Sequence, residues 1–281
     1  MEPQTYNVRH ANDEDDCSII GSCLAKFWIV LADSRNRKLK LLHSACNPND
    51  NNVITTCDFT CEINDVCSVG AFRVAVALDD GFQFVQARSR VEFVLERKIL
   101  CGHRCNGINS RNNTIYVVDN HKLYAYNIEN GEEMPGEIYD AGDQSDLCKV
   151  SVSHKHNDNR IFIADRNHGS ECVIVLQYQE GQIRDWKIVD DCLRHIRDIA
   201  FIPSDNPYGH VLILVENAAN PFVWVSLSEN NGHQIRQDFP QPVTGIQHPL
   251  SLGCSQEDTI IIGGQRDNSV SKVQLTAMLV L

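Results

Sequence analysis

The sequence lacks any long apolar run. The longest, from Phe27 to Ala32, has six residues, whereas a helix that crosses a bilayer needs about 20. The first residues lead into the acidic stretch from Asp13 to Asp16 and lack the basic-then-apolar order of a signal peptide. We therefore expect no membrane contact and a cytoplasmic location.

Basic charge is also scarce, with 25 Lys+Arg against 37 Asp+Glu and a formal net charge of −12. An acidic chain repels phosphate at long range. DNA is therefore not expected as a partner, and RNA would need a strongly segregated basic patch. The 12 cysteines in 281 residues do not make the dense framework of a small secreted scaffold, and we expect thiols that fill apolar space.

Catalytic and cofactor motifs are missing as well. No G-x-S-x-G elbow and no G-x-x-x-x-G-K-[ST] phosphate loop occurs. Cys101, His103 and Cys105 have the donor types of a zinc site, but no C-x₂-C pair lies nearby, and a blade-junction loop with buried thiols is the expected alternative. We expect no metal, no cofactor and no enzymatic activity.

What the sequence does contain is a weak repeat. Six segments share an apolar run, a polar turn and a second apolar run. Their turn residues are Asp33, Asp79, Asp119, Asp165, Glu216 and Gly264. The spacing is about 40 to 51 residues, so the chain holds about six units.

Each unit reads as strands, because short β-branched runs end at Gly, Asn, Asp or Pro and no 3.6-residue period is sustained. Four strands in about 46 residues match one propeller blade. A two-domain β-sandwich would not explain the recurring spacing, and a β-helix or a leucine-rich solenoid needs a shorter period. We predict an all-β chain: a six-bladed β-propeller over residues 15–281 with four antiparallel strands per blade, behind an acidic N-terminal tail over residues 1–14.

The double runs also carry a family resemblance. The segment from Ala32 to Leu41, ADSRNRKLKL, resembles the D-x-x-N-x-x-[IL]-x-[VL] core of an NHL repeat, and the segment from Ala164 to Asn167 begins in the same way. With the blade openings at Cys17 to Cys23, Asn64 to Gly70 and Cys105 to Ile108, the chain resembles the six-bladed NHL-like (NHL/TolB-type) domain of invertebrate B-box or tripartite-motif proteins. The second blade lacks the Asn and the fifth has Glu216 in place of Asp.

That resemblance implies a recognition module that selects substrates for ubiquitin transfer. The RING, B-box and coiled-coil modules of the family are absent from the sequence given, so ligase activity would reside elsewhere. We expect the chain to bind a protein or peptide partner without catalysing a reaction.

Loops between the second and third strands, and between blades, share one face of a propeller and carry binding residues. The predicted contact residues are Arg35, Asn36, Arg37, His103, Arg104, Asn120, His121, Arg166, Asn167, Arg194, His195 and Arg197. Arginine and histidine on this face suit an acidic peptide, a carboxylate or a phosphate. The alternative interpretation is that turns are polar in any case.

Two other functions stay open. Some six-bladed propellers are calcium-dependent lactonases or esterases with carboxylates in the central channel, although Asp33, Asp119 and Asp165 are expected to structure turns instead. Some NHL domains read single-stranded RNA, which needs phosphate contacts and stacking aromatics. Here Tyr116, Tyr124 and Trp224 fall at strand positions expected to lie in the core.

Overall fold

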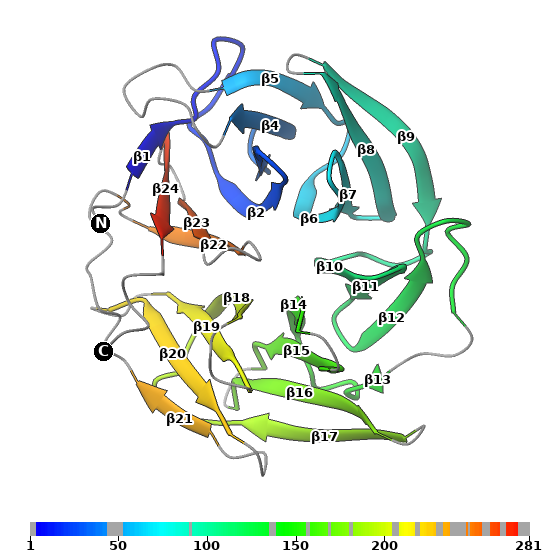
Figure 1. Cartoon of the computed structure of the whole chain (residues 1–281), viewed down its shortest axis with the longest axis vertical. Coiled ribbons are helices and arrows are strands. Elements are labelled where there is room, and N and C mark those ends of the chain that lie inside the picture. The colour runs from blue at the N-terminus through cyan, green and yellow to red at the C-terminus, as the bar shows by residue number, and fades with distance from the viewer. Residues whose placement is uncertain are drawn as a thin grey trace.

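The computed structural model describes residues 4–43, 53–89, 92–134, 139–155, 158–167, 170–179, 182–203, 208–216, 220–228, 233–236, 246, 248–254, 259–264 and 268–274. These residues form six four-stranded antiparallel sheets and no helix. The sheets stand around a common axis like the blades of a propeller (Figure 1). The predicted all-β six-bladed β-propeller is confirmed. None of the described residues belongs to a helix that could span a membrane.

Each of the first five blades is one continuous stretch of chain. The strands are β2 (Ile19–Ala25), β3 (Trp28–Asp33), β4 (Lys38–His43) and β5 (Val53–Asp58) in blade one; β6 (Ile63–Gly70), β7 (Arg73–Leu78), β8 (Gly81–Ser89) and β9 (Glu92–Leu100) in blade two; β10 (Gly107–Arg111), β11 (Thr114–Val118), β12 (Lys122–Asn127) and β13 (Tyr139–Asp140) in blade three; β14 (Leu147–Val152), β15 (Arg160–Asp165), β16 (Cys172–Gln179) and β17 (Gln182–Ile188) in blade four; and β18 (Ile196–Ile202), β19 (His210–Val215), β20 (Phe222–Leu227) and β21 (His233–Arg236) in blade five.

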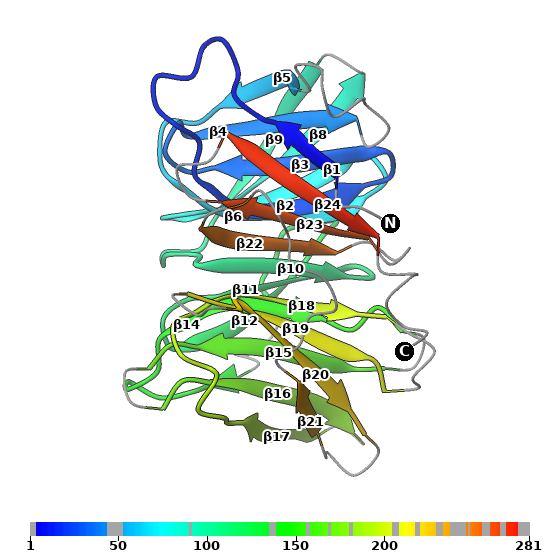
Figure 2. The same ribbon diagram turned by 90° about the vertical axis from the view of Figure 1, so that its left-hand side faces the viewer.

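The sixth blade is built from both ends of the described chain. It combines β22 (Pro249–Cys254), β23 (Thr259–Gly264) and β24 (Ser269–Gln274) with the N-terminal β1 (Gln4–Asn7). Tyr6 pairs with Val270, and its side chain is fully buried. Figure 2 shows β1 lying along β24.

This closure corrects the predicted tail over residues 1–14. Residues 4–7 are the outer strand of blade six, and Asp13 is a buried ion-pair partner of Lys40. The acidic composition of the segment suggested solvent exposure. In the fold, however, the N-terminal strand β1 pairs with β24, completes blade six and covers an edge of its sheet that would otherwise be open.

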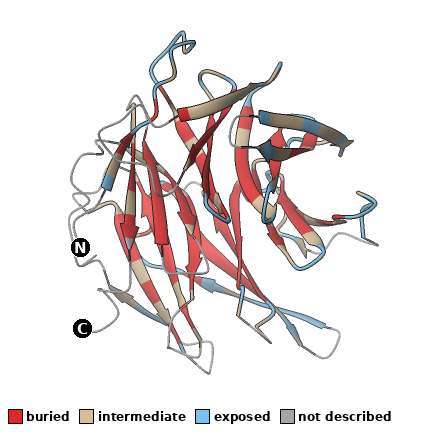
Figure 3. Ribbon diagram, turned by 45° about the horizontal axis from the view of Figure 1, so that its top comes forward, coloured by how far each residue is buried: buried red, intermediate tan, exposed pale blue. Residues whose placement is uncertain are grey.

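The apolar runs explain the burial. β3, β15 and β23 are buried at every position, as expected for strands covered on both faces, whereas the outer strand β17 is mostly exposed (Figure 3). Six hydrophobic clusters form the core, one between each pair of neighbouring blades. The cysteines that the structure describes are free thiols.

Candidate functional site

The innermost strands share a β-bulge near their start. The register shifts between Ile19 and Gly21, and equivalent shifts occur at the start of β6, β14, β18 and β22. A bulge leaves one residue out of the ladder and re-aims its side chain. The bulged residues are Ile20, Asn64, Cys148, Arg197 and Leu250, and Asn106 holds the corresponding place before β10.

These six residues surround the axis on one face of the ring. All of them line a single cavity of about 490 Å³, which we call the axial funnel. The innermost strands around it are visible in Figure 1. The remaining lining residues are Ser18, Arg104, Asn120, Asp146, Lys149 and Arg166. Every blade therefore provides the residue at its bulge position to the lining of the funnel, because this backbone position lies at the axis in each blade.

Lys149, the residue after the bulge of blade four, crosses the axis at the floor of the funnel. Its Nζ donates to the carbonyl oxygen of Ile20 in blade one at 2.7 Å and lies 3.0 Å from Asp65 Oδ1 in blade two. Burial lowers the pKa of Lys149, but the carboxylates of Asp65 and Asp198 outweigh this and raise it above its ordinary value. The ammonium is a fixed internal cation that joins opposite blades.

Two aspartates from opposite blades face this ammonium. Asp65 accepts backbone N–H groups from Val66 and Ile108, and Asp198 accepts them from Ile199 and Leu252. Burial raises the pKa of Asp65 and, despite the charge of Lys149, raises that of Asp198 to about 7. Each carboxylate thus links its blade to the next one while sharing the central cation.

Arginines form the walls above Lys149. Arg104 pairs with Asp79 at 3.1 Å and donates to Asn64 Oδ1 at 3.0 Å. Arg166 pairs with Asp146 at 3.3 Å, with about a third of its side chain exposed.

Arg197 pairs with Glu216 and is exposed to a similar extent. Asn106 donates to Asn120 Oδ1 and to the carbonyl of Leu147, at 2.8 and 2.9 Å. The polar wall is held in place by hydrogen bonds between blades.

Four of the predicted contact residues meet in the funnel: Arg104, Asn120, Arg166 and Arg197. Arg35 and Arg37 instead line a neighbouring cavity of about 780 Å³ between blades one and two. The structure therefore divides the predicted arginine cluster between two cavities.

The other predicted residues do not line either cavity. They are Asn36, His103, His121, Asn167, Arg194 and His195. Asn36 supports the turn after β3 by donating to Asp33 Oδ2 at 2.8 Å, and the ring of His103 stacks on Tyr124 at 4.2 Å. His195 has a left-handed backbone with φ 57° and lies 3.9 Å from Glu171.

Sequence reasoning missed the floor and most of the walls. Lys149 lies within the buried strand β14, Asn64 lies within β6, and Asn106 directly precedes β10. The signal that could have found them is their common place at the start of the innermost strand of each unit.

The turn aspartates behave as predicted. Asp33 Oδ1 accepts the backbone N–H of Ser18, and Asp119 Oδ1 accepts those of His121 and Lys122. Asp165 Oδ1 accepts the N–H of Asp146 at 2.9 Å. These carboxylates structure loops, and they are not among the residues that line the funnel.

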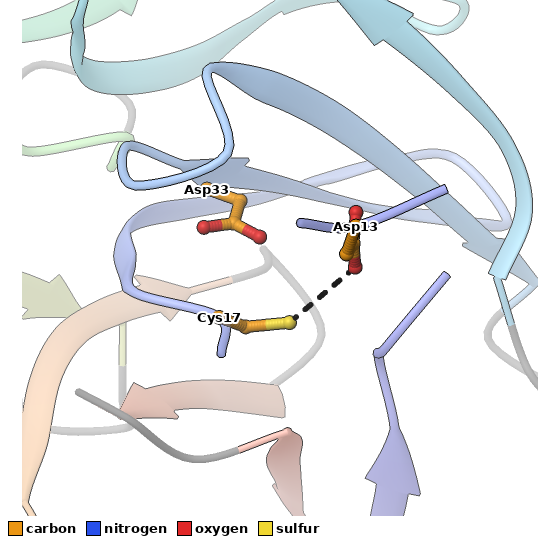
Figure 4. A group of neighbouring side chains, drawn as sticks. All are labelled: Asp13, Cys17 and Asp33. Atoms are coloured by element: carbon orange, nitrogen blue, oxygen red, sulfur yellow. Dashed lines mark hydrogen bonds between the residues drawn. The ribbon is translucent and has the colours of Figure 1, made fainter. Parts of the chain in front are cut away.

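A separate cluster of potential metal ligands lies in blade one. The ligand atoms of Asp13, Cys17 and Asp33 are within 4.8 Å of one another (Figure 4). The Lys40 ammonium lies 2.6 Å from Asp13, 2.7 Å from Asp33 and 2.9 Å from the Cys17 sulfur. The donors of this cluster already surround a cation that belongs to the chain.

The same argument applies at the axis, where the hydrolase alternative places calcium. The Lys149 ammonium already occupies a carboxylate oxygen of Asp65 and the carbonyl oxygen of Ile20. These two oxygens therefore do not fit a calcium ion as well. Cys101, His103 and Cys105 do not converge as a three-ligand group in the described part of the chain. His103 instead lies 3.4 Å from the Tyr126 hydroxyl.

Comparisons with known proteins support the architecture alone. No family model matches the sequence, and no curated protein matches it. Among solved structures, a Kuenenia stuttgartiensis hydrazine synthase chain aligns with a TM-score of 0.64 and 12% identity, over 90% of this chain and 75% of that chain. A Bacteroides thetaiotaomicron protein of unknown function aligns with a TM-score of 0.63 and 11% identity, over 96% of this chain and 75% of that chain. At such low identities the likeness shows a shared β-propeller fold.

Proposed function

We propose that this propeller is a non-catalytic recognition module that binds a protein or peptide partner in the axial funnel. The observation that carries the proposal is the placement of charge. Arg104, Arg166, Arg197 and Lys149 line the cavity, and Asp146 is the single acid among the described residues that line it. In a chain with a net charge of −12, this gathers four basic side chains around one cavity.

The carboxylate partners of Arg104 and Arg197 lie behind them, whereas Asp146, the partner of Arg166, lines the funnel itself. Asp79 pairs with Arg104 and Glu216 pairs with Arg197, but neither carboxylate is among the residues that line the funnel. The ion pairs therefore turn their positive ends toward the cavity. Guanidinium groups held in this way bind carboxylates through paired N–H donors, and rigid strands fix their positions.

The finer assignment is part of the same proposal. We infer an NHL-like domain of the tripartite-motif type, whose partner would be a substrate selected for ubiquitin transfer by modules outside this sequence. A cytoplasmic location accompanies it, supported by free thiols such as Cys23 and Cys148 that are buried in the core. The NHL-like residues of blades one and four support this assignment.

A peptide-display selection tests the binding function. The folded chain is panned against a random peptide library in parallel with the triple variant Arg104→Gln, Arg166→Gln and Arg197→Gln. We expect acidic peptides to be enriched on the original chain and lost on the variant. The control carries Arg184→Gln and Lys187→Gln on the exposed strand β17 and should enrich the same peptides. Enrichment that is equal on the triple variant would refute the proposal.

The two other functions give different results in the same series. Single-stranded RNA retained at physiological salt, and lost on the triple variant, would replace the peptide proposal with RNA recognition. Calcium-dependent turnover of a lactone or an ester, together with a calcium-induced rise in melting temperature, would replace it with hydrolysis.

A further inference from the structure

The axial funnel is not isolated from the cavity between blades one and two. Ser18 lines both cavities. Asp79 lines the outer cavity, and its partner Arg104 lines the funnel. The two cavities therefore adjoin at the start of blade one, and we call the pair the radial groove.

Arg37 supplies an uncommitted cation in the outer part of this groove. Its backbone is left-handed, with φ 53°, which is uncommon for a residue other than glycine. Its N–H donates to Ser34 O at 3.1 Å, and its carbonyl accepts from Phe59 N at 2.9 Å. Within the described part of the chain its guanidinium has no carboxylate partner, whereas Arg35 beside it pairs with Asp15.

The outer cavity also contains carboxylates. Asp79 is neutralised by Arg104 and accepts from the Asn64 amide at 3.1 Å. Glu62 lines the same cavity without such a pair in the described residues. Among the described residues, Arg37 and Glu62 are therefore a cation and an anion without an ion-pair partner at this end of the groove.

We propose that the groove binds an extended peptide that carries two acidic groups, one in the funnel against Arg166 and Arg197 and the other against Arg37. This inference rests on the proposed peptide-binding function and specifies its ligand. A polar groove of two joined cavities, of about 490 and 780 Å³, suits an extended chain, which advances about 3.3 Å per residue. Charge complementarity then fixes the positions of the two acids.

Synthetic peptides test the inference by fluorescence polarisation. The probes are Gly/Ser peptides with one glutamate, and matched peptides with two glutamates separated by one to eight residues. We expect the two-glutamate peptides to bind at least about ten-fold more tightly than the one-glutamate peptide, with an optimum at one separation.

Variants separate the two ends of the groove. Arg37→Gln should remove the advantage of the second glutamate and leave one-glutamate binding unchanged, and Glu62→Gln should strengthen two-glutamate binding. The joint variant Arg166→Gln and Arg197→Gln should weaken both peptides. Arg184→Gln, on the exposed β17, is the matched control and should change neither.

The outcomes distinguish this inference from the proposed function. Equal binding of the two peptide classes, or no effect of Arg37→Gln on two-glutamate binding, would overturn the bipartite groove and leave funnel binding intact. Binding that does not depend on Arg166 and Arg197 would overturn the proposed function itself.

Discussion

Replacing Lys149 with methionine removes the cation at the axis while keeping most of the side-chain volume. The ammonium lies 3.0 Å from Asp65 Oδ1 and donates to the carbonyl oxygen of Ile20 at 2.7 Å, and the Lys149 side chain is 8% exposed. Removing one partner of a buried ion pair costs about 3–5 kcal/mol because the other charge is left uncompensated. We expect a loss of that size in the free energy of unfolding at pH 8.

The loss should depend on pH in a defined direction. The pKa of Asp198 in the fold is raised to about 7, so the folded chain keeps this proton between about pH 4 and pH 7, where the unfolded chain has lost it. Stability therefore falls as pH rises through this window. Without Lys149 the pKa of both aspartates rises further, and the fall becomes steeper and extends to higher pH.

Urea denaturation at pH 8 and pH 5, followed by tryptophan fluorescence, measures the effect. At pH 5, below the raised pKa of Asp198, that aspartate holds its proton, and the loss caused by Lys149→Met should shrink by at least about 1.4 kcal/mol. Lys187→Met on the exposed β17 is the control and should stay within about 0.5 kcal/mol at both pH values. Adding Asp198→Asn to Lys149→Met should restore part of the loss. A loss under about 1 kcal/mol at pH 8, or an equal loss at both pH values, would refute the reasoning.

Three further substitutions probe other parts of the ring. Asp13→Asn removes a carboxylate from the buried Lys40 ammonium. The pKa of Asp13 is lowered in the fold, against burial, by its bond to Lys40, so the expected loss of about 1.5–3 kcal/mol at pH 7 should vanish as pH falls below about 4 in thermal melts. Tyr6→Ala should cost about 3–5 kcal/mol in urea denaturation because the fully buried ring helps to close blade six; a cost under 1 kcal/mol would contradict the closure. Gly21→Ala should cost about 1–3 kcal/mol by the same assay, since its Cβ would lie 2.5 Å from an aspartate oxygen of blade two. Gly70→Ala, with 3.9 Å to its nearest neighbour, should cost less than half as much.

Much of the fold is readable from local sequence. The recurring pattern of an apolar run, a polar turn and an apolar run predicts six units because each hairpin is encoded within a few residues. The roles of Asp33, Asp119 and Asp165 follow for the same reason, since a turn carboxylate binds backbone N–H groups close to it along the chain or at the start of the same blade. The repeat also predicts that the loops between the second and third strands of the blades lie together on one exposed face.

The site was only partly predictable, because its residues converge from distant parts of the chain. Lys149 reaches a carbonyl 129 residues away, and no local pattern shows that a lysine in an apolar strand crosses the axis. Arg197 enters the funnel through a bulge in β18, whereas Arg37 points into a different cavity.

The number of blades, their antiparallel strands and the polar loops that join them could be predicted from the sequence, because these depend on hydrophobic period and turn chemistry. The closure of the ring, with Gln4–Asn7 completing the last blade, and the set of side chains that meet at the axis emerge only in the folded chain. The physical reason is that bulges change the direction of single residues, and ring closure brings six such positions together around one point.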